Sequence, residues 1–223
     1  MKFLTLTPSF AEHPMVKIDV ADSQKPFFVH KKVICDESTF FYQYFNGPTK
    51  PGSIVLHHVS IETMRTYTLW LYDKGGLFVN EQIGTDDDFE IKEELQFDRY
   101  GEKADEKPAK RLWWADLDRA NRVFGRLLDL YNFSTFYGSP DFTKDVMKAW
   151  QVFTTTRKSY PCATVIRRAI TEMDNSAPLY KYLILCFVNY DIYHIPCDGE
   201  LSKLPASFLA DVLVSSMYKG MAG

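Results

Sequence analysis

The chain has 223 residues, a formal net charge of −3 and a hydrophobic fraction of 46%. This length accommodates one large domain or two small ones. The near-neutral charge gives no reason to expect nucleic acid as a partner, because phosphate binding needs a basic surface. The aromatic fraction of 15% is high and favours extensive packed surfaces or interfaces.

Two features bear on the cellular compartment. The four cysteines form no C-x-x-C pair, and we expect them to be reduced thiols: Cys35, Cys162, Cys186 and Cys197. The apolar N-terminal run MKFLTLTPSF is too short for a secretory signal, and Tyr180–Tyr190 is far below the roughly 20 residues of a membrane span. The sequence therefore predicts an intracellular protein, nuclear or cytoplasmic, with no membrane contact.

Strand signals lie in the first third of the chain. Residues 1–15 form a leader, and the strict alternation of Val16–Val20 predicts a half-buried strand. Phe27–His30 is its expected hairpin partner, and Ser53–Val59 is a third strand. Ser60 is a good cap for a helix that runs to about Asp73, in which Ile61, Met64, Thr68 and Leu71 share one side.

The stretch Phe27–Phe41 is a compact strand–turn–helix unit. Asp36 and Ser38 can cap a helix, and an aromatic i, i+1, i+4, i+5 stripe follows them: Phe40, Phe41, Tyr44 and Phe45. Because these side chains are apolar, we expect the unit to pack rather than to react.

The segment 81–111 differs in charge from the rest of the chain. It holds eleven acidic and six basic residues, a net charge of −5, against 18 acidic and 20 basic residues elsewhere. We interpret it as a solvated insertion at about 77–111. Its short core offers three candidate partner-docking residues: Phe89, Ile91 and Glu93.

Helical periodicity dominates the remainder. Ser139-Pro140-Asp141 is a well-formed helix start, and a long helix before it should have six residues on one side: Leu117, Ala120, Phe124, Leu127, Leu128 and Tyr131. Three further helices are expected after Pro161, Pro178 and Pro205, and the last carries five apolar residues at helical spacing: Phe208, Leu209, Val212, Leu213 and Met217. The order of elements predicts an α+β fold, with a small sheet packed with helices and a helical C-terminal extension at 156–223.

No enzyme or metal signature is present. The sequence lacks a phosphate-binding loop, a dinucleotide fingerprint, H-E-x-x-H and G-x-S-x-G. His57 and His58, adjacent on a predicted strand, would point to opposite sides. His194 and Cys197 lack the second pair of a zinc site, Cys162 lacks a histidine nearby in sequence, and Asp86–Asp88 lacks the spacing of a calcium loop. We expect no catalytic residue, metal or cofactor.

Several residues together resemble the BTB/POZ family. Phe28–Cys35 followed by Ser38–Phe41 is similar to the family pattern f-x-V-H-K-x-x-L-x-x-x-S-x-x-F, and Trp70-Leu71-Tyr72 resembles its f-x-x-W-L-Y helix. The chain is most similar to fungal members without zinc fingers or kelch repeats. The resemblance covers residues 15–75 well and 112–155 loosely, which places the domain at 16–155. The residues that carry it are Val29, His30, Lys31, Val33, Ser38, Phe41, Trp70, Leu71 and Tyr72.

The resemblance implies a protein–protein interaction module. In such a module His30 and Ser38 are structural, the small sheet lies beside helical hairpins, and the partner is either cullin-3, for ubiquitin transfer to a bound substrate, or a second copy. Ile91-Lys92-Glu93 fits the hydrophobic-x-Glu motif of cullin-binding members, whereas Met15 stands where dimeric members often have an acidic residue. The alternative is a self-associating scaffold or transcription-linked regulator that acts through its C-terminal helices.

Overall fold

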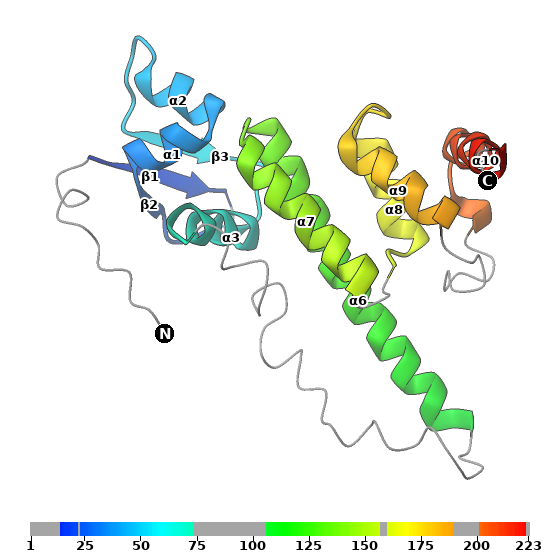
Figure 1. Cartoon of the computed structure of the whole chain (residues 1–223). Coiled ribbons are helices and arrows are strands. Elements are labelled where there is room, and N and C mark those ends of the chain that lie inside the picture. The colour runs from blue at the N-terminus through cyan, green and yellow to red at the C-terminus, as the bar shows by residue number, and fades with distance from the viewer. Residues whose placement is uncertain (1–13, 22, 74–105, 157–159, 190–200, 222–223) are drawn as a thin grey trace. The chain divides into compact units, whose positions relative to one another are not determined.

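A computed structural model describes residues 14–21, 23–73, 106–156, 160–189 and 201–221 of the chain. These residues form two compact units. The first contains the described residues up to Asp73 together with 129–146, and the second contains 106–128 and the described residues from 147 onward. Each unit has its own buried core. Figure 1 labels the helices and strands of both units along the chain.

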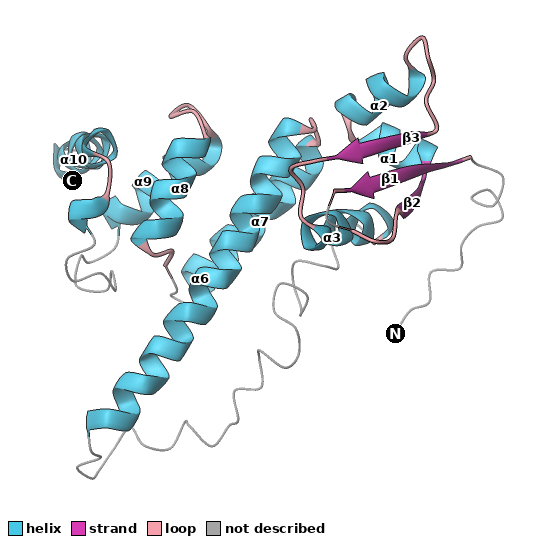
Figure 2. Cartoon of the chain, turned by 180° about the vertical axis from the view of Figure 1, so that it is seen from behind, coloured by secondary structure: helices cyan, strands magenta, loops and turns pink. Residues whose placement is uncertain are grey.

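A three-stranded sheet organises the first unit. Its strands are β1 (Met15–Val20), β2 (Phe27–His30) and β3 (Ser53–Leu56), in the order β2-β1-β3 (Figure 2). The expected hairpin is confirmed, since β1 pairs antiparallel with β2, and β1 also pairs in parallel with β3. The strict alternation places one row of side chains in the core: Val16, Ile18, Val20, Val29, Ile54 and Leu56.

The third strand is shorter than the sequence predicted. Its pairing with β1 ends where Val20 meets Leu56, because β1 itself ends there. His57 and His58 therefore follow the strand in a bend, and both are exposed. The prediction that they lie on a strand and point to opposite sides of a sheet was wrong.

Three helices flank the sheet in the first unit: α1 (Lys31–Glu37), α2 (Thr39–Asn46) and α3 (Ile61–Tyr72). Ser60 caps α3 as predicted, since its hydroxyl accepts from the Thr63 N–H at 3.1 Å. The buried side of α3 is centred on Tyr67 and Trp70, whereas Ile61 and Thr68 are only half-buried.

The aromatic stripe of α2 is divided between the core and the surface. Phe41 and Phe45 are fully buried, with their rings stacked 6.1 Å apart. Phe40 is half-buried and Tyr44 is exposed, although we expected all four rings to pack. Phe41 and Phe45 lie about 40° apart around the helix, and Phe40 and Tyr44 lie on one flank of this buried side.

The first unit is completed by the end of α6 (Glu106–Phe136) and the start of α7 (Pro140–Thr156). The Tyr67 ring contacts those of Phe133 and Phe142, at centroid distances of 4.8 and 5.0 Å. The Trp70 indole N–H donates to the Asp145 carboxylate at 2.8 Å. The helix start predicted at Pro140 is confirmed.

The second unit is helical. It contains residues 106–128 of α6, the remainder of α7, and four further elements: α8 (Ala163–Glu172), α9 (Pro178–Asn189), the 3-10 turn η4 (Leu201–Lys203) and α10 (Ala206–Met221). Its core includes a contact between the Phe124 and Trp150 rings at 5.1 Å. The helix predicted after Pro205 is confirmed as α10, and its apolar residues are divided: Phe208 is buried and Val212 half-buried, whereas Leu213 and Met217 are exposed.

The α+β fold class predicted from the sequence is confirmed, because the strands cluster in the first third and helices follow. Residues 74–105, which include most of the charged segment, lie outside the described residues. Helix α6 already begins at Glu106, within that segment, and extends further in both directions than the periodicity of 117–131 indicated. Among the helices described, none combines the length and the apolar character needed to cross a bilayer.

Candidate functional site

The residues that carry the family resemblance lie together in the first unit. Val29, Phe41, Trp70 and Leu71 are buried in its core, and Val33 is half-buried. Lys31 is half-buried, and its ammonium group donates to the Phe45 carbonyl at 2.7 Å. These side chains are therefore used in packing and in local hydrogen bonds.

His30 and Tyr72 connect the two halves of the sequence pattern. The His30 backbone N–H donates to the Tyr72 hydroxyl at 2.9 Å, and the His30 Nδ1 lies 2.7 Å from the same oxygen. The hydroxyl can accept the first bond and donate the second, which keeps His30 Nδ1 as an acceptor. One tyrosine thus fixes both the end of β2 and the end of α3.

Ser38 connects segments that are 99 residues apart. It is 1% exposed, and its hydroxyl accepts from the Phe41 N–H at 3.2 Å while donating to the Tyr137 carbonyl at 2.5 Å. The next residue, Thr39, donates its N–H to the Gly138 carbonyl at 3.0 Å. Ser38 is thus both the cap of α2 and the anchor of the turn between α6 and α7.

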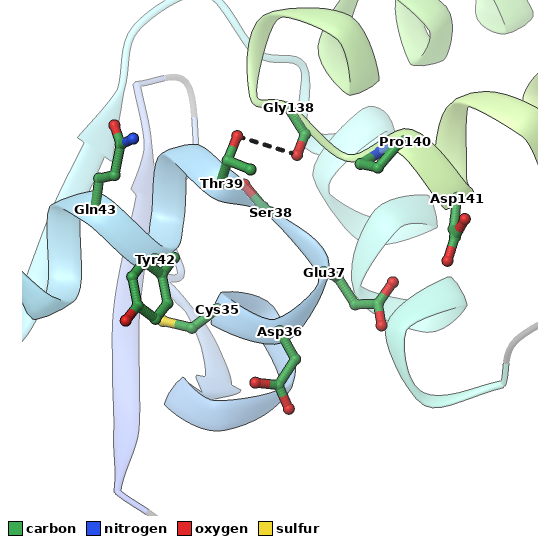
Figure 3. A pocket seen from close by; sticks show the side chains of 10 residues that line it. All are labelled: Cys35, Asp36, Glu37, Ser38, Thr39, Tyr42, Gln43, Gly138, Pro140 and Asp141. Atoms are coloured by element: carbon green, nitrogen blue, oxygen red, sulfur yellow. Dashed lines mark hydrogen bonds between the residues drawn. The ribbon is translucent and has the colours of Figure 1, made fainter.

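A shallow groove of about 320 Å³ lies over this junction (Figure 3). The end of α1 and the start of α2 form one wall, and the α6–α7 turn forms the other. Ten residues line it: Cys35, Asp36, Glu37, Ser38, Thr39, Tyr42, Gln43, Gly138, Pro140 and Asp141.

Three carboxylates and one thiol line the groove. Asp36 pairs with Lys32 at 2.8 Å and Asp141 with Lys144 at 2.7 Å, so two of its three carboxylates already have cationic partners. Burial raises the pKa of the Cys35 thiol, which keeps it protonated and therefore a poor nucleophile. No histidine lines the groove to act as its base.

A row of four aromatic rings, which we call the aromatic ridge, lies on the other flank of α2. It contains Phe136, Tyr137, Phe40 and Tyr44, with successive ring centroids 4.9, 5.0 and 6.1 Å apart. Tyr137 is buried and supports the row, whereas Phe136 is 74% exposed and Tyr44 is also exposed. Exposed aromatic side chains on a rigid support are typical of protein interfaces.

The sequence did not reveal the ridge. Phe136 precedes the turn residues Gly138 and Pro140, but nothing in the sequence distinguishes an exposed aromatic residue from a buried one. The ridge arises because Ser38 and Thr39 hold the α6–α7 turn against α2.

The remaining candidate residues have different outcomes. The proposed docking residues Phe89, Ile91 and Glu93 lie outside the described residues, as do Asp86–Asp88, His194 and Cys197. Cys162 is half-exposed at the cap of α8, and its backbone N–H donates to the Asn121 side chain at 3.1 Å. Within the described ranges, no three His, Cys, Asp or Glu side chains are grouped so that they could hold a metal ion.

A scan against protein-family models finds no match to the chain, and a search of curated proteins finds none either.

Proposed function

We propose that the chain is a protein–protein interaction module of BTB type and a candidate substrate adaptor for a cullin-3 ubiquitin ligase. The observation that carries the proposal is the aromatic ridge, which offers exposed rings on a scaffold fixed by long-range hydrogen bonds. Rigid aromatic anchors lose little conformational entropy on binding, and they are enriched among the residues that dominate binding energy.

The arrangement of the first unit supports the BTB assignment. The resemblance implies a small sheet beside helical hairpins, and the first unit has a three-stranded sheet, the α1–α2 pair and the ends of α6 and α7. The residues of the sequence pattern are engaged inside this unit, so partner binding is left to its outer surface. An adaptor of this kind would act in the nucleus or the cytoplasm.

The ridge can be tested with single substitutions. Tyr44→Ala and Phe136→Ala each remove one ring of the ridge. Because the Tyr44 ring also contacts that of buried Phe45 at 5.3 Å, the circular dichroism spectrum of each variant must match that of the wild type. Each should weaken cullin-3 binding at least tenfold in isothermal titration against the cullin-3 N-terminal region, as expected for an interface hot spot. Phe28→Ala is the matched control, because Phe28 is an aromatic residue of the same unit, 58% exposed on the outer side of the sheet.

Three results would argue against the proposal, at different levels. Absence of cullin-3 binding by the wild-type chain would reject the adaptor role. An equal loss of binding in Phe28→Ala would reject the ridge as the docking surface. The interaction module itself would be rejected if co-purification from native cells yields no protein whose capture depends on Tyr44 and Phe136.

A further inference from the structure

Helix α10 has apolar side chains on two opposite sides. One side packs within the second unit, where the Phe208 ring contacts those of Tyr180 and Phe187 at centroid distances of 5.8 and 5.3 Å. The opposite side, which we call the outer stripe, contains Ala210, Leu213, Val214 and Met217. Their i, i+3, i+4, i+7 spacing places them within about 100° of one another around the helix.

The outer stripe is exposed. Leu213 and Met217 are 64% and 63% exposed, Val214 is 51% exposed, and no described residue covers them. An ordinary surface helix is apolar on one side and polar on the other, whereas a helix that is apolar on both sides needs a partner on each.

The outer stripe also carries no charge. The two charged side chains of α10 are engaged with α9, since the Tyr180 hydroxyl donates to Asp211 at 2.6 Å and the Lys219 ammonium donates to Asn189 at 2.7 Å. A second copy of α10 would therefore bring no like charges together.

We propose that the outer stripe pairs with the same stripe of a second copy of the chain, in antiparallel orientation about a two-fold axis between Leu213 and Val214. This register sets Leu213 of each copy against Val214 of the other, and small Ala210 against long Met217. A large side chain facing a small one lets two helices approach closely, and a two-fold interface requires this self-complementarity.

The exposed area of the outer stripe is enough for a weak pair. Leu213, Val214 and Met217 with the adjacent Tyr218, which is 70% exposed, offer roughly 500 Å² on each copy. Two copies would then bury about 1,000 Å², which is near the lower limit for a specific interface. We expect a weak, concentration-dependent dimer with a dissociation constant in the micromolar range. The pairing is independent of the BTB assignment and of cullin-3 binding.

Sedimentation velocity of the full chain over a range of about 1–300 µM tests the pairing. The wild type should show a reversible monomer–dimer equilibrium. Met217→Glu should raise the dissociation constant at least tenfold, because it sets a charge against the apolar stripe. Phe28→Glu places a charge at an exposed position of the sheet and should leave the dissociation constant unchanged within twofold. Circular dichroism spectra should match the wild type, since both positions are exposed.

A mixing experiment tests the register. Met217→Glu and Ala210→Lys should each dimerise poorly alone, but an equimolar mixture should form a heterodimer in which the two new charges face each other. A monomeric wild type at about 300 µM would overturn the proposal. So would a dimer that survives Met217→Glu, or a mixture that stays monomeric.

Discussion

Replacing Ser38 by alanine tests whether one hydroxyl holds the first unit together. Ser38 is 1% exposed, and its hydroxyl both caps α2 and donates to the Tyr137 carbonyl, 99 residues away. Loss of an N-cap destabilises a protein by about 1 kcal/mol. A buried carbonyl left without its donor adds about 1–3 kcal/mol. We therefore expect Ser38→Ala to lower the free energy of unfolding by about 2–4 kcal/mol.

Ser60→Ala is the matched control. Ser60 is also a serine N-cap, and it accepts from the Thr63 N–H at 3.1 Å, but it is exposed and its hydroxyl contacts only Thr63 among the described residues. Its loss should cost only about 1 kcal/mol. The long-range bond to Tyr137 is thus the main difference between the two substitutions.

Urea denaturation followed by circular dichroism measures both variants, and hydrogen exchange locates the effect along the chain. Ser38→Ala should speed exchange in α2 and in the α6–α7 turn, whereas Ser60→Ala should affect the start of α3 alone. Equal losses of stability within about 0.5 kcal/mol would refute the reasoning, because the Tyr137 bond would then contribute nothing measurable.

Three further substitutions test other parts of the fold. Trp70→Phe should destabilise the chain by about 1–3 kcal/mol more than Trp150→Phe in urea denaturation. The reason is that the Trp70 indole N–H donates to Asp145, whereas the buried Trp150 indole N–H has no hydrogen-bond partner among the described residues. Equal losses of stability would contradict this. Gly138→Ala should lower stability by at least about 1 kcal/mol, because φ is +61° and a Cβ atom would lie 2.1 Å from the Thr39 hydroxyl; an unchanged melting temperature would count against it. Burial raises the pKa of Cys186 to about 11, so the folded state holds a proton that the unfolded thiol, with its usual value of 9.0, releases earlier. The free energy of unfolding should therefore be level below about pH 9 and fall between about pH 9 and 11. Thermal melts at about pH 8 and 10.5 measure this fall, and Cys186→Ala should reduce it. An identical fall in both proteins would show that Cys186 is not its source.

Local signals in the sequence predicted the parts of the fold that local physics determines. The alternation of Val16–Val20 has a period of two, so it specified the buried row of β1 without knowledge of its neighbours. Ser60 and Pro140 mark helix starts because their caps and fixed dihedral angles act within one turn.

Pairings between distant segments left no such signal. The residues of Ser53–Leu56 do not indicate that this strand pairs in parallel with β1. The sequence around Ser38 likewise does not indicate that the Tyr137 carbonyl is its acceptor. Such contacts depend on which elements meet in the folded chain. The anchoring role of Ser38 and the position of Phe136 on the ridge could therefore be recognised only in the structure.

Two helices bury only part of the apolar residues that periodicity groups together, and the cause is the same in both. Both α2 and α10 have apolar residues around more than half of their circumference, so periodicity identifies a helix without showing which side enters the core. Packing selects Phe41 and Phe45 in one helix and Phe208 in the other, and it leaves Tyr44, Leu213 and Met217 exposed. Exposed apolar surface of this kind is unfavourable in an isolated chain, and it is typical of surfaces that bind a partner. Periodicity thus fails to identify the buried side in the two helices that carry the aromatic ridge and the outer stripe, and these are the surfaces where we place the two interactions.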